Sequence, residues 1–105
     1  MVTKEAAIKS VESLAKDIKN SGINLRKVIL YGSFAKDKQN EDSDIDVALV
    51  ADEFTGAGFI DIQLFVKYLI NYIRVQPRTY STDYFEEGDP FIDEIKKSGI
   101  EINNY

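Results

Sequence analysis

Two aspartates and a glycine-serine pair are the residues of this chain best suited to chemistry. Asp44 and Asp46 are two positions apart, so on a strand their side chains would point to the same face. Two such carboxylates, completed by phosphate oxygens, are ligands that Mg²⁺ takes. Gly32 would let the backbone approach a phosphate closely, and Ser33 adds a hydroxyl and an N–H. The pattern therefore indicates a metal-assisted nucleotide site.

Each half of this pattern also has an ordinary structural explanation. Asp44 and Asp46 could simply lie at the solvent-facing end of a strand. Gly32-Ser33 could be a turn from a strand into a helix, with Ser33 as the N-cap. The combination is more specific, because ten residues separate Ser33 from Asp44 and an apolar run flanks each motif.

Composition narrows the kinds of chemistry that the chain can perform. With 105 residues it is expected to form a single domain, residues 1–105. It contains no cysteine and no histidine, which excludes disulfides, zinc sites built on these residues and imidazole bases. The net charge of −5 argues against bulk nucleic-acid binding. No apolar run reaches the roughly 20 residues of a membrane span, so a cytoplasmic protein is expected.

Hydrophobic periodicity and turn residues predict a small α/β or α+β domain. Its predicted sheet is mixed, with three to four strands and helices packed on it. An amphipathic helix is expected over 3–20, a helix buried between layers over 59–71, and a helix from Asp89-Pro90 to about Lys97. Strands are expected over 26–31, 44–50 and 72–76, with a short edge strand over 99–102. Pro77 is expected to end or edge the third long strand.

An apolar strand, Gly-Ser, about ten residues, and Ser-Asp-Ile-Asp opening a second apolar strand form a compound motif. This motif resembles the nucleotidyltransferase superfamily with the polymerase-beta-like fold, and within it the minimal single-domain nucleotidyltransferases. The resemblance covers roughly residues 26–76. It implies a transferase that moves a nucleoside monophosphate, AMP from ATP, to an acceptor hydroxyl and releases pyrophosphate.

The resemblance also assigns roles to individual residues. Asp44 and Asp46 would be the catalytic carboxylates and the ligands of Mg²⁺. Gly32 and Ser33 would hold the triphosphate of the nucleotide. Lys36, in the turn after Ser33, is the best placed of three basic residues that could contact phosphate, the others being Lys38 and Arg78.

The sequence departs from the family pattern at the third carboxylate, which the family carries on a neighbouring strand. Alternation along 72–76 places Gln76 at that position, and an amide cannot act as a base at neutral pH. Substitutes elsewhere in the chain are Asp61, Asp83, Glu86, Glu87 and Asp89, although an N-cap role is expected for Asp89 and a solvated loop for the Glu86-Glu87 pair.

Two functions follow from these observations. One is an active nucleotidyltransferase using ATP and magnesium. The other is a catalytically impaired module that binds nucleotide or a partner, as the neutral Gln76 suggests. In the family such domains often accompany a helical HEPN-type toxin and act as its antitoxin. Leftover apolar surface would favour a partner subunit, either such a protein or a second copy of this chain.

Overall fold

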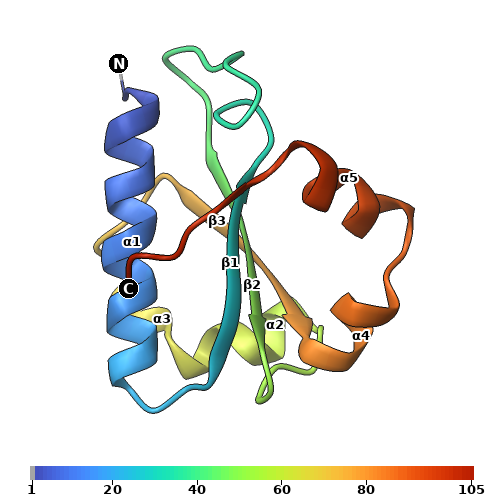
Figure 1. The fold of residues 1–105 in the computed structure, drawn as a ribbon. Helices are drawn as coiled ribbons and strands as arrows, with labels where there is room; N and C mark the ends of the chain where they lie inside the picture. The colour runs from blue at the N-terminus through green and yellow to red at the C-terminus, as the bar shows by residue number, and fades with distance from the viewer. Residues whose placement is uncertain (1) are drawn as a thin grey trace.

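The chain folds around a four-stranded mixed sheet, seen in a computed structural model that describes residues 2–105 (Figure 1). The strand order is β3-β2-β1-β4. β2 runs antiparallel to β1 and parallel to β3, and β4 pairs antiparallel with β1. The strands are β1 (Leu25–Tyr31), β2 (Ile45–Ala51), β3 (Val75–Ser81) and β4 (Ile100–Glu101). The predicted mixed α/β sheet is confirmed.

Helices cover both faces of this sheet and divide the core in two (Figure 1). On one face lie α1 (Lys4–Asn20), α2 (Gly58–Asp61), the 3₁₀ turn η1 (Ile62–Leu64) and α3 (Val66–Leu69). On the other face lie α4 (Thr82–Glu87) and α5 (Pro90–Ser98). Among residues 2–105 no helix has the length and apolarity to cross a membrane.

The long N-terminal helix forms as predicted. Thr3 is its N-cap and accepts a hydrogen bond from the backbone N–H of Ala6 at 3.1 Å. Five apolar residues at helical spacing are fully or almost fully buried against the sheet, which fixes the face that α1 turns inward: Ala7, Val11, Leu14, Ala15 and Ile18.

The prediction of one buried helix over 59–71 is wrong. The segment forms α2, η1 and α3, interrupted at Phe65, whose backbone leaves the helical region (φ −141°, ψ 12°). Phe65 is buried, and apolar neighbours at helical spacing pack beside it against the core. The remaining apolar residues have no layer above them and are exposed: Phe59, Ile60, Leu64, Val66, Ile70 and Ile73. A run that is apolar on every side does not show which side the sheet will cover.

The third long strand begins and ends later than predicted, and α4 was not predicted. Pro77 lies inside β3, not at its end. The N–H of Ile45 donates to the carbonyl of Arg74 at 2.8 Å, and main-chain groups alternate in direction along a strand. The nitrogen of Pro77 therefore faces the open edge of the sheet, where no hydrogen bond is lost.

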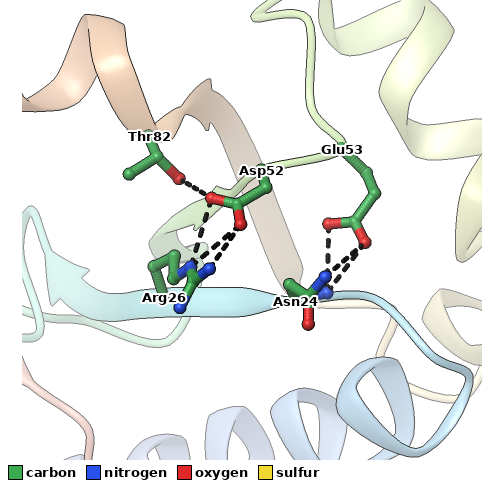
Figure 2. Close-up of polar contacts among 5 residues, drawn as sticks. All are labelled: Asn24, Arg26, Asp52, Glu53 and Thr82. Carbon is green, nitrogen blue, oxygen red and sulfur yellow. Dashed lines mark hydrogen bonds and ion pairs between the residues drawn. The ribbon is translucent and has the colours of Figure 1, made fainter.

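At the end of β2 farther from Gly32, polar side chains pair with one another (Figure 2). Arg26 donates from Nε and Nη2 to both carboxylate oxygens of Asp52, and Thr82 Oγ1 donates to Asp52 Oδ1 at 2.7 Å. Beside them, Glu53 accepts hydrogen bonds from the backbone and side chain of Asn24. This network joins β1, the end of β2 and the start of α4.

Candidate active site

Gly32 and Asp46 are in direct contact, which brings the two halves of the sequence motif into one site. Tyr31 pairs with Asp46 across the antiparallel β1–β2 ladder, and Gly32 follows at once. Gly32 has φ +75°, and a Cβ added there would collide with Oδ2 of Asp46. Glycine is therefore required at this position for two reasons: its backbone has a positive φ, and the Asp46 carboxylate occupies the space that a Cβ would need.

Asp44 is held just before β2 by a tight turn. Asn40 and Ser43 close that turn, with the N–H of Asn40 donating to Ser43 Oγ at 2.9 Å and the N–H of Ser43 donating to the Asn40 carbonyl at 3.2 Å. Arg74 Nη1 donates to the Ser43 carbonyl at 3.1 Å. Arg74 thus supports the backbone beside Asp44.

Burial and a second carboxylate set the electrostatics of Asp46. Partial burial raises the pKa of Asp46, and the charge of Asp44 raises it further. The two carboxylates therefore lie close enough to repel, and a divalent cation between them would relieve both effects. Two carboxylates with substrate phosphates and water suit Mg²⁺, and in this respect the residues present fit the ion.

The segment after Ser33 forms successive turns, and not the regular helix that the sequence suggested. The N–H groups of Lys36 and Lys38 donate back to the carbonyls of Gly32 and Ser33 at 3.2 and 2.8 Å. Phe34 is fully buried and anchors the turns in the core. Gly32 and Ser33 thus lie on a fixed loop next to Asp46.

Lys36 lies in this loop but pairs within the protein. Its Nζ is 3.3 Å from Glu94 Oε1 of α5, with both side chains about half exposed. Such an exposed pair contributes little to stability. Lys36 thus lies in the loop, with its charge paired to Glu94 of α5.

On the neighbouring strand Gln76 lies directly beside Asp46. The parallel β2–β3 register pairs these two residues, so their side chains share a face of the sheet. The expected third-carboxylate position is thus the one that Gln76 occupies. Within residues 2–105, no group of three acidic, histidine or cysteine side chains is arranged to hold a metal ion.

Asp61, one of the candidate substitutes, has a structural role. It is buried and accepts hydrogen bonds from Thr55 N and Oγ1, Gly56 N and Thr79 Oγ1 at 2.8–3.0 Å. Burial pushes the pKa of Asp61 upward, but these hydrogen bonds together bring it below its usual value. Thr79 alternates with Arg78 and so lies on the face away from Asp46.

The other candidate acids also lie outside the site. Asp89 caps α5, accepting from Ile92 N at 2.7 Å, and it accepts from Tyr84 OH at 2.7 Å. Asp83, Glu86 and Glu87 lie exposed on α4, so the loop expected for Glu86-Glu87 is a helix.

An arginine and two aromatic rings complete the face beside Asp46. Arg78 follows Gln76 by two positions on β3 and so shares its face. Its guanidinium lies 4.7 Å from the centre of the Phe91 ring, and that ring meets Tyr31 edge-on at 5.8 Å. Sequence reasoning ranked Arg78 behind Lys36, because Lys36 lies in the turn directly after Ser33.

Three comparisons bear on the identity of this fold. A family model described as "Polymerase beta, Nucleotidyltransferase" matches residues 12–104. The fold is similar to that of a nucleotidyltransferase candidate from Sulfolobus solfataricus, with TM-score 0.69, 18% identity, and coverage of 93% of this chain and 80% of that one. It is also similar to a chain in a crystal structure of a toxin–antitoxin with AMP-PNP, with TM-score 0.63, 18% identity, and coverage of 90% and 73%. No curated protein matches this chain.

The family match covers both the Gly-Ser turn and the aspartate pair, and the structure brings these into contact. At 18% identity the two solved structures add the fold alone. The chain belongs to the polymerase beta nucleotidyltransferase family.

Proposed function

We propose that this protein transfers AMP from ATP to an acceptor hydroxyl on a partner protein, with magnesium bound at Asp44 and Asp46. The observation that carries the proposal is the contact between Gly32 and Asp46. The Gly32-Ser33 loop, which would hold the triphosphate, lies next to Asp46, so a nucleotide on this loop would be within reach of the carboxylates that hold the cation.

In this reaction the acceptor oxygen forms a bond to the α-phosphorus, and the bond from that phosphorus to pyrophosphate breaks. Magnesium, when bound, supplies charge neutralisation for the phosphates. Gly32 and Ser33 position the triphosphate through their backbone, and Asp44 and Asp46 hold the cation. The amide of Gln76 cannot take the acceptor's proton, which passes to the aspartate pair or to solvent.

The test is transfer of label from α-labelled ATP, with magnesium, to a candidate HEPN-type partner. Asp46→Ala is expected to abolish both transfer and magnesium-dependent ATP binding. Gln76→Glu is expected to raise the rate, because it adds the carboxylate that the family pattern carries beside Asp46. Transfer that survives Asp46→Ala would show that the chemistry lies elsewhere.

A second candidate is an antitoxin-like module that binds nucleotide and partner without transfer. The pairing of Gln76 with Asp46 favours it, because the site lacks its third acid. Magnesium-dependent ATP binding with no labelled product in any partner mixture would select this reading. Restoration of transfer by Gln76→Glu would then identify Gln76 as the cause.

The exposed apolar residues of the 59–73 segment support a protein partner under either reading. Phe59 is 77% exposed and Ile73 is 86% exposed, in a chain that has few other large apolar side chains on its surface. Lys67 within this segment and Arg74 directly after it are exposed, and both are positively charged. Two copies would therefore set like charges against each other, whereas an apolar surface edged by acids would fit.

The surface is tested by two measurements on the double variant Phe59→Ser, Ile73→Ser. Its affinity for the HEPN-type partner is expected to fall at least ten-fold, while magnesium-dependent ATP binding stays at the wild-type level. Light scattering of the wild-type chain alone is expected to give a monomer. A dimer that the double variant dissociates would assign the surface to a second copy instead.

A further inference from the structure

The strand beside Asp46 carries a cation where the family pattern leads one to expect further negative charge. Gln76 is neutral, and Arg78 is the next residue of β3 on the same face. Among the residues that the structure describes, no carboxylate forms an ion pair with Arg78. An arginine without an ion-pair partner can offer its N–H donors to an anionic ligand.

Two aromatic rings hold this guanidinium in place. It lies 4.7 Å from the centre of Phe91 and 5.9 Å from the centre of Tyr80. Stacking on rings leaves the edge of a guanidinium, and therefore its N–H groups, open. The side chain is thus positioned by contacts that do not consume its hydrogen-bonding capacity.

Arg78 and Asp46 lie on the same face of the sheet. Gln76 pairs with Asp46 in the β2–β3 register, and Arg78 follows Gln76 by two positions. Tyr31 pairs with Asp46 on the other side, and its ring meets the Phe91 ring over which the guanidinium of Arg78 lies. A ligand bound next to Asp46 therefore lies close to Arg78.

Arg78 is exposed, so a ligand can reach its N–H groups. A cavity of about 420 Å³ borders Arg78 along the open edge of β3, where Tyr80, Ser81, Tyr84 and Asp89 also line it. Asp44, Asp46 and Gln76 do not line this cavity, so a phosphate near Asp46 would meet the guanidinium from the side of Gln76.

We propose that Arg78 is a phosphate-binding residue of this site, where its guanidinium contacts the β- and γ-phosphates of a magnesium-bound nucleoside triphosphate. A site with three carboxylates would obtain its positive charge from bound metal ions. Here the guanidinium of Arg78 would supply part of that charge. The inference rests on the proposed nucleotide function and adds to it a subsite on β3.

Titration calorimetry with AMP-PNP and with AMP, each with magnesium, tests the subsite without turnover. Arg78→Gln is expected to weaken AMP-PNP binding about ten-fold or more, the loss expected for a charge-assisted pair, and to change AMP binding little. Arg78→Lys should recover part of the loss, because it keeps the charge without the planar fork. Lys67→Gln removes the same charge from α3 and should bind as wild type does.

The outcomes separate this inference from the function on which it rests. If Arg78→Gln binds AMP-PNP as wild type does while Asp46→Asn has lost it, the subsite is wrong and the nucleotide function stands. An equal loss of AMP and AMP-PNP binding would also overturn the subsite, since it would place Arg78 away from the β- and γ-phosphates. A wild-type protein that binds neither nucleotide would overturn both proposals.

Discussion

β2 carries an aspartate near each end, and the two have opposite environments. Asp52 is paired with Arg26 and Thr82, and these hydrogen bonds lower its pKa to about 2 (Figure 2). Among residues 2–105 no basic side chain forms an ion pair with Asp46, and burial and then the charge of Asp44 raise its pKa. The same side chain is thus structural where the chain supplies its partner. Where the partner must come from outside, the carboxylate is free for function.

The largest effect that separates the two ends concerns nucleotide chemistry. Asp46→Asn is expected to lower transfer by about 100-fold or more, the scale seen when one charge-stabilising group is removed from an active site. Asp52→Asn should leave transfer near wild type. The measurement is the initial rate of labelled product at saturating magnesium. Equal losses in both variants would contradict the division between the two ends.

Gly32→Ala tests the contact that makes the Asp46 end a site. The added Cβ meets Asp46, and the positive φ alone costs about 1–2 kcal/mol in the free energy of unfolding. Gly22→Ala is a matched control, because Gly22 has φ +102° with nothing within 4 Å of the added atom. Both variants should lose stability in urea, but only Gly32→Ala should also lose ATP binding. Equal binding in both would show that the contact is not functional.

Substitution of Asp52 should lower Tm and spare activity, whereas substitution of Asp46 should lower activity and spare Tm. Asp52→Asn replaces an acceptor of several hydrogen bonds and is expected to lower Tm, modestly because the pair is exposed. Asp46→Asn removes a partly buried, repelled charge and should leave Tm unchanged or raise it. Circular dichroism melts at pH 7 check both, and a fall in Tm for Asp46→Asn would contradict the unpaired environment described here.

The smallest expected effect is the acid dependence of stability. The folded-state pKa of Asp52 is about 2 against an ordinary 3.8, so its stabilisation is present above pH 3.8 and is lost as pH falls toward 2. Asp46 has a raised folded-state pKa, so its protonation increases stability as pH falls through that value toward 3.8. Urea unfolding between pH 2 and about 6 measures the free energy of unfolding. In Asp52→Asn this free energy should fall less steeply with acid than in the wild type. In Asp46→Asn the increase in this free energy on acidification should disappear.

Much of the fold and the core of the site could be predicted from sequence, because the signals are local. Apolar spacing gave α1, and the Gly32-Ser33 and Asp44-Asp46 spacing gave two motifs that the structure brings into contact. The position of Gln76 was predicted from the family pattern and the alternation of side chains along a strand that was placed too early. The β2–β3 register confirms that Gln76 lies beside Asp46.

The remaining features depend on contacts between distant segments. The continuation of β3 through Pro77 required knowing that this strand lies at the sheet edge. The exposed side chains of 59–73 required knowing which side of the segment meets the sheet. Arg78 of β3 lies over Phe91 of α5, and a contact between a strand and a helix cannot be read from the spacing of residues within either element.

The hydrogen bonds of Asp61 have a consequence for association. They tie residues 55–56, just before the exposed apolar segment, to Thr79 of β3. The start of the segment is therefore ordered before any partner arrives, and the entropy of ordering is not subtracted from the binding free energy at that end. β3 also carries Gln76 and Arg78 on its other face. One strand thus links the proposed docking surface to the proposed nucleotide site, so a small displacement at one would be transmitted to the other.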